Sequence, residues 1–314
     1  MLDRFGREIT YLRLSVTELC DLRCRYCMPE EGICKVPREW LLTEEEMVQA
    51  VEAAAALGVR KLRITGGEPL VKPNILSLVR RCAAAPGIQE VCLTTNGLGL
   101  GELARPLREA GLERVNISLD TLDGEKYAYM TRRDRLDDAL AGLEAALEAG
   151  FRQVKVNVVL IGGFNDGEIP ALAELTRRWP VDVRFIELMP MGGDFPPGAY
   201  LPCGAVLERL PQLEAEAAQG TARLYRLPGA LGRVGLISPV SAHFCAWCDR
   251  LRLTADGKLK PCLHGEAEFS IRGLDRAGME AVMRRAILAK PECHAPLSSA
   301  QPSQAGRAMH RIGG

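Results

Sequence analysis

The feature that most constrains the fold of this chain is a repeated alternation of short apolar strand patterns with amphipathic helix patterns. The segments between strands are long enough to hold a helix, which favours parallel pairing through crossover connections. Six βα units in series predict a parallel sheet, either an open layer or a barrel. The expected strands are Leu12–Thr17, Lys61–Thr65, Glu90–Thr95, Arg114–Asp120, Val154–Ile161 and Asp182–Met189.

Helix boundaries are marked by residues that satisfy free backbone groups. Thr43 and Glu46 form a potential capping box at the start of the clearest helix. Glycines 58, 111 and 150 stand where helices would end. The other expected helices cover Asn74–Ala84, Glu102–Ala110, Leu136–Ala149 and Gly167–Arg178.

One face of the expected strands is repeatedly polar. Arg13, Ser15 and Thr17 share a face of the first strand, and Lys61, Arg63 and Thr65 share a face of the second. The later strands add Asn116, Ser118, Asp120, Lys155, Asn157 and Arg184. Parallel strands are normally apolar on both faces, so this pattern indicates a barrel whose lumen is left open for a polar ligand. An antiparallel sheet with one wet face would alternate in the same way, but the helical spacers disfavour it.

Composition excludes several classes of partner. Lys plus Arg number 40 and Asp plus Glu number 40, so no global basic field indicates nucleic acid. The charged N-terminus lacks the features of a signal peptide, and no apolar run is long enough for a membrane helix. We therefore expect a cytoplasmic protein without a membrane partner. In that compartment the 11 cysteines indicate metal binding or redox chemistry rather than disulfides.

The composition changes after Met189, where a segment rich in Pro and Gly begins. We expect one domain over residues 1–215 and a small module over residues 216–314. Short strands are expected at Arg223–Leu227, Arg233–Ile237, Arg250–Thr254 and Lys258–Lys260, with a hairpin turn at 255–257. A helix follows near Leu274–Leu288, and the tail from Pro291 reads as a loop.

A first cysteine triad, Cys20, Cys24 and Cys27, follows the first strand with C-x₃-C-x₂-C spacing. Three thiolates can hold a [4Fe–4S] cluster and leave one iron open for a small molecule. From spacing alone, a zinc site and reduced cysteines without a ligand role are the alternatives. The triad, with Tyr26 before its last cysteine, resembles the signature of the radical SAM superfamily, which uses S-adenosylmethionine (SAM).

Further motifs of that resemblance follow the other strands: Gly66–Pro69, Thr94–Gly97, Ser118–Asp120 and Glu187–Pro190. All stand at the carboxyl ends of expected strands, where barrel enzymes build their sites. The resemblance implies an α/β fold, an incomplete (βα)₆ barrel of the TIM type with a small C-terminal cluster-binding module.

A second triad, Cys245, Cys248 and Cys262, lies in the C-terminal module. Spacing alone leaves zinc and an iron–sulfur cluster equally open, with His243 or His264 as a fourth zinc ligand. The surrounding segment 244–262, the segment 185–192 and the terminal Gly313-Gly314 resemble the GTP 3′,8-cyclase family of molybdenum cofactor biosynthesis, over essentially the whole chain.

This resemblance implies the roles of individual residues. The two triads hold two [4Fe–4S] clusters, one of which binds SAM. Positions that contact SAM match Tyr26, Gly67, Ser118 and Met189. Positions that bind GTP match Arg13, Arg63, Thr94, Lys155, Arg184, Arg250, Leu251 and Arg252. Catalytic roles are implied for Arg13, Gly313 and Gly314.

The implied activity is that of a radical SAM lyase that removes the 3′ hydrogen of GTP and forms 3′,8-cyclo-7,8-dihydro-GTP. Implied partners are an external electron donor and cyclic pyranopterin monophosphate synthase acting downstream, with the protein a monomer or homodimer. Two alternatives stay open: another radical SAM enzyme with an auxiliary cluster, such as a peptide-modifying maturase, and a non-catalytic zinc-stabilised module. 

Two departures from the family pattern concern Asp21, where Asn is frequent, and Arg132-Arg133, where a Gly is common. The remaining cysteines have no partner at ligand spacing. We expect Cys82 and Cys92 to be buried, Cys34 and Cys203 to lie in loops, and assign no role to these four or to Cys293.

Overall fold

The computed structural model describes residues 1–33, 36–191, 198–217, 220–298 and 300–313. Its strands are β1 (Tyr11–Ser15), β2 (Lys61–Thr65), β3 (Glu90–Thr95), β4 (Arg114–Ser118), β5 (Gln153–Leu160), β6 (Val181–Glu187), β7 (Glu214–Ala215), β8 (Arg223–Arg226), β9 (Arg233–Ile237), β10 (Arg250–Leu253), β11 (Lys258–Lys260) and β12 (Phe269–Ser270). Its α-helices are α1 (Glu44–Ala56), α2 (Ile75–Ala83), α3 (Leu100–Glu109), α4 (Gly124–Thr131), α5 (Leu136–Glu148), α6 (Ile169–Arg178), α7 (Gly204–Arg209), α8 (Arg276–Leu288) and α9 (Met309–Ile312).

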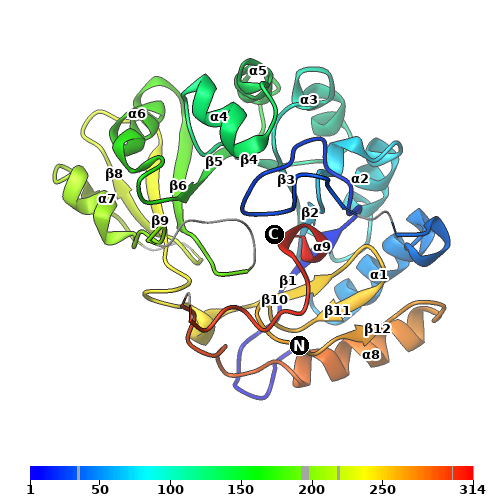
Figure 1. The fold of residues 1–314 in the computed structure, drawn as a ribbon. Helices are drawn as coiled ribbons and strands as arrows, with labels where there is room; N and C mark the ends of the chain where they lie inside the picture. Colours follow the sequence, from blue (N-terminus) through cyan, green and yellow to red (C-terminus); the bar gives the residue numbers. More distant parts are fainter. Residues whose placement is uncertain (34–35, 192–197, 218–219, 299, 314) are drawn as a thin grey trace.

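The described strands form one sheet in the order β12-β11-β10-β1-β2-β3-β4-β5-β6-β9-β8-β7. Strands β1 to β6 pair in parallel with their neighbours, as the sequence predicts. The sheet curves around a central space with α2 to α6 outside it, which is the arrangement of an incomplete barrel (Figure 1). The six predicted strands all form, with ends within two residues of their expected positions.

The C-terminal part of the chain extends both edges of this barrel. Strand β9 pairs in parallel with β6, and β10 pairs in parallel with β1. Beyond them, β8 and β7 on one edge and β11 and β12 on the other continue in antiparallel fashion. Residues from the last quarter of the chain therefore stand directly beside the first strand.

The outer face of the sheet is apolar and packs against the helices. Leu12, Leu14, Leu62 and Ile64 of the first two strands are fully buried there. Helix α1 begins with the capping box that the sequence predicts, since Thr43 accepts from the Glu46 amide and the Glu46 carboxylate accepts from the Thr43 amide.

Two expectations need correction. Helix α4 is absent from the predicted elements, because its short segment has weak apolar periodicity, although Asp123 caps it by accepting from the Lys126 amide at 3.0 Å. The expectation of a loop-like tail is wrong at α9, which lies inside the curve of the sheet near the C-terminus (Figure 1). No helix in the described ranges is both long and apolar enough to span a bilayer.

Candidate active site

The first triad lies in the loop that leaves the carboxyl end of β1. The Cys27 amide donates to the Cys24 carbonyl at 2.9 Å, which forms a tight turn between these two cysteines. Burial raises the pKa of the Cys20 thiol to about 12 and that of the Cys27 thiol to about 11. Without metal these groups are therefore thiols, and a bound cluster would release their protons.

The two departures from the family pattern both affect this loop: Asp21 lies in it, and Arg132 contacts it. Arg132 has φ 55°, the left-handed region that favours Gly, which explains why Gly is common at this position. Its guanidinium donates to the carbonyls of Arg23 at 2.8 Å and Met28 at 3.2 Å, so it holds the loop between the first two cysteines and again just after the third. Asp21 accepts from the Asn96 side-chain amide at 2.6 Å.

Asn96 also connects the triad loop to the Gly66–Pro69 motif. The buried Glu68 carboxylate accepts from the Asn96 amide at 2.6 Å and from the Thr95 hydroxyl at 2.8 Å. Burial raises the pKa of Glu68 to about 7. A Cβ at Gly67 would meet the Leu19 carbonyl, so only Gly allows this approach to the triad loop. Side-chain and backbone hydrogen bonds thus join the ends of β2 and β3 to the cysteine loop.

A small cavity beside Cys24 gathers two of the residues matched to SAM positions. Tyr26 and Ser118 both line it, together with Asp120. The Tyr26 hydroxyl donates to Asp120 at 2.8 Å, and burial raises the pKa of Asp120 to about 6. Gly67 and Met189 follow β2 and β6 at the same end of the sheet but do not line this cavity.

The second triad lies at the opposite end of the parallel strands. Cys245 and Cys248 precede β10, which runs parallel to β1, and Cys262 follows β11, which returns antiparallel to β10. All three therefore stand near the amino-terminal end of β10. The Tyr11 amide, where β1 begins, donates to the carbonyl next to Cys248. One triad is thus at each end of the β1–β10 pair.

Two buried cations that sequence reasoning missed support the second triad. Arg7 donates to the carbonyls of Cys245 at 2.7 Å and Pro291 at 2.6 Å. Lys290, 3% exposed, donates to the carbonyls of Arg250 and Pro261. Burial raises the pKa of Cys248, but Lys290 and Arg250 outweigh it, so that pKa lies below its ordinary value. Both residues stand outside any ligand motif, so spacing gave no signal for them.

The register of the sheet aligns the predicted substrate-binding cations across its inner face. Arg13 of β1 is paired with Arg252 of β10 on one side and with Arg63 of β2 on the other. Further along the sheet, Asn116, Lys155 and Asp182 form a second row, and Asn157 and Arg184 belong to a third. We call the space that this inner face encloses the cationic chamber. Its lining cations are Arg13, Arg63, Lys155, Arg184, Arg250 and Arg252.

Hydrogen bonds fix Arg63 within the chamber. Its guanidinium donates to the Leu93 carbonyl at 3.1 Å, to the Thr94 hydroxyl at 3.2 Å and to the Tyr11 hydroxyl. Tyr11 is a further residue that the sequence analysis missed, since a Tyr in a strand is usually part of the core. Its pKa is raised by burial and lowered by Arg63, Arg13 and Arg250, and the cations prevail.

The cations of the chamber repel one another. Burial, and after it the charge of Arg184, lowers the pKa of Lys155 to about 6. Burial likewise lowers the pKa of Arg184 and that of Arg252 to about 10 each. A polyanion that enters this space relieves both the repulsion and the desolvation. The chamber is therefore suited to several adjacent phosphates.

The Leu251 side chain does not face the cationic chamber. Leu251 lies between Arg250 and Arg252 on β10, so the strand alternation turns its side chain to the other face, where it is buried in the apolar core.

The C-terminal tail enters the chamber. The Gly313 carbonyl accepts from the Arg252 guanidinium at 3.0 Å and from Arg13 at 3.5 Å. The His310 ring lies 3.1 Å from the Cys27 carbonyl, so α9 joins the first triad to the chamber. Gly314 lies outside the described residues, as does Cys34.

The donor sets fit iron–sulfur clusters better than zinc. Each triad supplies three cysteines, which matches a [4Fe–4S] cluster with one iron left open, whereas a structural zinc site takes four protein ligands. His264, a candidate fourth ligand, has its Nδ1 3.0 Å from the Ser303 hydroxyl.

The other described cysteines stand apart from both triads. Cys82 and Cys92 are buried, as expected, and Cys293 is exposed. Cys203 lies in the turn before α7, as expected of a loop position, and it is buried, with its Sγ 3.3 Å from the Ile237 carbonyl.

Comparison with known proteins agrees with this geometry. The chain matches the Radical SAM superfamily over residues 14–176 and the Molybdenum Cofactor Synthesis C family over residues 181–296. It is 48% identical to the GTP 3′,8-cyclase of Moorella thermoacetica and 46% identical to that of Alkaliphilus metalliredigens, in both cases over 100% of each chain.

Among solved structures, Streptococcus suis SuiB has a TM-score of 0.63 at 15% identity, with 91% of this chain and 66% of that chain covered, which shows a shared fold. The full-length identity to the curated relatives is decisive. The chain belongs to the GTP 3′,8-cyclase family of the radical SAM superfamily.

Proposed function

We propose that this protein converts GTP to 3′,8-cyclo-7,8-dihydro-GTP in molybdenum cofactor biosynthesis, with the residue roles set out below. The observation that carries the proposal is the row of cations in sheet register between two cysteine triads. The triads stand at opposite ends of β1 and β10, so a substrate in the chamber lies between them.

Cys20, Cys24 and Cys27 would hold the cluster that binds SAM, and Cys245, Cys248 and Cys262 the second cluster. When bound, the first cluster and SAM supply an electron and a radical that abstracts hydrogen. Tyr26, Ser118, Gly67 and Met189 would contact SAM. Of these, Tyr26 and Ser118 share the cavity beside Cys24, where the Asp120 carboxylate fixes the Tyr26 ring by accepting a hydrogen bond from its hydroxyl.

Arg63, Lys155 and Arg184 would bind the triphosphate. Arg63 is held by three hydrogen bonds, so its planar donors are oriented before the nucleotide arrives. Arg250, Arg252 and the Leu251 backbone would lie next to the base and the second cluster, since β10 leaves that triad.

Arg13 and the C-terminal glycines would act at the ribose. Arg13 lies in the same row as Arg63 and Arg252, and its guanidinium reaches the Gly313 carbonyl. The tail covers the chamber next to the first triad, which excludes water from a radical reaction. The proposal includes an external electron donor, a downstream enzyme that forms cyclic pyranopterin monophosphate, and a division of the chain near residue 215.

The test is anaerobic incubation of cluster-reconstituted protein with SAM, dithionite and GTP, with ATP as the matched nucleotide. We expect 5′-deoxyadenosine and a cyclised guanine nucleotide by mass spectrometry, and no cyclised product from ATP. Cyclised product from a Cys24→Ser or Cys248→Ser variant at the wild-type rate would contradict the two-cluster assignment.

A further inference from the structure

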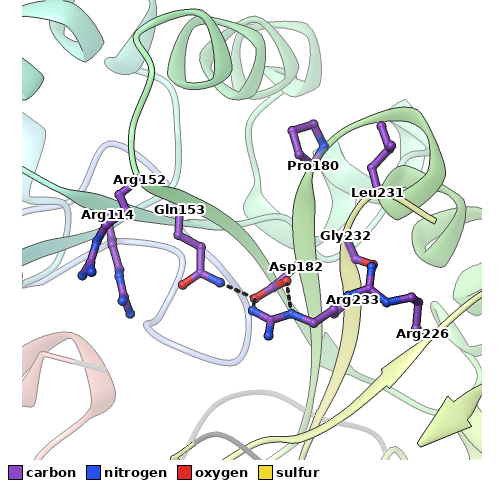
Figure 2. A pocket seen from close by; sticks show the side chains of 9 residues that line it. All are labelled: Arg114, Arg152, Gln153, Pro180, Asp182, Arg226, Leu231, Gly232 and Arg233. Atoms are coloured by element: carbon purple, nitrogen blue, oxygen red, sulfur yellow. Dashed lines mark hydrogen bonds and ion pairs between the residues drawn. The ribbon is translucent and has the colours of Figure 1, made fainter. Parts of the chain in front are cut away.

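The two ends of the barrel differ in what covers them. At the amino-terminal ends of β4, β5, β6 and β9, a cavity of about 400 Å³ has four arginines in its wall (Figure 2). All four are ion-paired, among them Arg233 with Asp182 at 2.9 Å, as Figure 2 shows, and Arg114 with Glu90 at 3.0 Å. The positive charge of this cavity is therefore already neutralised by neighbouring carboxylates.

At the carboxyl end, the chamber is covered by the end of the chain itself. The Gly313 carbonyl accepts from Arg252 at 3.0 Å. A Cβ on Gly313 would meet the side chains of Thr65 and Ser15, which are the last residues of β2 and β1. The last described residue thus lies against the ends of these two strands, inside the curve of the sheet (Figure 1).

Little local structure holds this tail in place. From Pro291 to Ala308 the described residues form no helix or strand. Helix α9 has four residues, and a helix of this length is not stable on its own. The position of Gly313 must therefore depend on contacts between the tail and the rest of the chain.

Arg307 holds the tail through two forked ion pairs. Its guanidinium donates to both oxygens of Asp256, at 3.1 and 2.9 Å, and to both oxygens of Glu268, at 2.6 and 2.8 Å. The Arg307 side chain is 14% exposed, and forked pairs of this kind fix an arginine more firmly than single surface pairs do. Closer to the terminus, Arg311 makes a single pair with Glu18 at 3.4 Å.

Lys260 completes a neutral cluster around Arg307. Its fully buried side chain donates to Glu268 at 3.2 Å and to the carbonyl of Ala305, two residues before Arg307, at 3.0 Å. The two cations balance the two carboxylates, so that the cluster can remain largely buried. We call Arg307, Lys260, Asp256 and Glu268 the tail anchor.

The tail anchor is built on the hairpin that also serves the chamber and the second triad. Asp256 lies in the turn between β10 and β11. Strand β10 carries Arg252, and Cys262 follows β11. The segment between Arg307 and Gly313 is therefore fastened to one hairpin at both of its ends.

We propose that Arg307 is a positioning residue of the reaction, which sets the place of Gly313 over the chamber through its two carboxylate partners. This inference rests on the proposed function, in which the tail acts at the ribose. Loss of the anchor leaves the chamber cations free to bind GTP, but it leaves the tail undocked for a larger fraction of the time. The chemical step then slows, whereas the affinity for GTP does not fall.

The experiment compares the variants R307Q and R307K with wild type as cluster-reconstituted protein with SAM under anaerobic conditions. The matched control is R276Q, because Arg276 also pairs with two carboxylates, Glu52 and Glu280, but lies on α8. Hydrogen exchange read by mass spectrometry follows the amides of residues 309–313 and, separately, those of the hairpin 250–262. Turnover of GTP with dithionite gives kcat, and GTP binding without reductant gives Kd.

We expect the amides of residues 309–313 to exchange about threefold to tenfold faster in R307Q than in wild type, with no change in the hairpin. The kcat for cyclised product should fall by a similar factor, with the Kd for GTP within about twofold of wild type. R307K keeps the charge but loses the planar fork of donors, so it should fall between R307Q and wild type. R276Q should match wild type in each measurement.

Wild-type exchange of the tail in R307Q, or an unchanged kcat together with faster exchange, would overturn the proposal. Fewer than about eight irons per chain in R307Q would also overturn it, because Arg307 would then support the second triad rather than the tail. Wild-type protein that binds GTP but forms no cyclised product would instead refute the proposed function. Tail exchange in R307Q would still test the anchor in that case, so the two failures are distinguishable.

Discussion

Lys155 makes GTP binding dependent on pH in a direction that the structure defines. Its side chain is 4% exposed, and burial and Arg184 lower its pKa to about 6. At pH 7.5 the free protein therefore holds Lys155 mostly as the neutral amine. A triphosphate stabilises the ammonium form and raises this pKa in the complex. Binding above pH 7 must then take up one proton.

The direction and the size of the change in GTP affinity with pH follow from proton linkage. Because the complex holds a proton that the free protein lacks, GTP affinity falls as pH rises, by about tenfold per pH unit or about 1.4 kcal/mol. The range from pH 7.5 to 8.5 isolates this effect, since a phosphate monoester has lost its last proton well below it, with a pKa of about 6.

The assay is isothermal titration of unreduced protein with GTP at pH 7.5 and 8.5, in two buffers of different ionisation enthalpy, which counts the protons taken up. We expect about one proton for wild type and a flat pH profile for Lys155→Met and Lys155→Arg, with Lys155→Arg retaining affinity. A flat wild-type profile, or the same slope in Lys155→Met, would refute the reasoning.

Three further predictions concern the first triad and the tail. Cys24→Ser should retain about four irons per chain after reconstitution, against about eight for wild type. The control Cys82→Ser changes a buried cysteine outside both triads and should also hold about eight, and equal iron in all three proteins would contradict the ligand assignment. Arg132→Ala removes two hydrogen bonds to the triad loop and keeps the strained left-handed backbone, so the free energy of unfolding should fall by about 1–2 kcal/mol in thermal denaturation. An unchanged midpoint would show that these hydrogen bonds do not hold the loop. Gly313 has φ 80°, and a Cβ there would meet the Thr65 hydroxyl, so Gly313→Ala should abolish turnover with an unchanged melting temperature. The control Gly306→Ala, at a glycine with φ 65° and open space around it, should remain active, and equal turnover by the two variants would exclude a role for the tail.

Much of the barrel could be predicted because periodicity alone carries the information. The alternation in β1 and β2 separated apolar outer positions such as Leu14 and Ile64 from Arg13 and Arg63 within, and the register then paired those arginines. The motifs at strand ends needed only the rule that parallel strands end at the same edge of a sheet.

What the sequence could not show depends on contacts between distant segments. No local pattern indicates that Lys290 and Arg7 hold the second triad, because each acts on backbone carbonyls far away in sequence. Helix α9 is four residues long, too short for a periodic signal, and its position depends on a contact with Cys27. Leu251 was predicted as a member of a motif, but strand alternation turns its side chain into the core.

The most direct test of the central claim uses GTP labelled with deuterium at the ribose 3′ position, incubated anaerobically with reconstituted protein, SAM and dithionite. If the chamber holds the nucleotide between the two triads with its ribose next to the first, mass spectrometry will find the deuterium in 5′-deoxyadenosine together with a cyclised nucleotide. Unlabelled 5′-deoxyadenosine, formed while the GTP stays intact, would contradict the account.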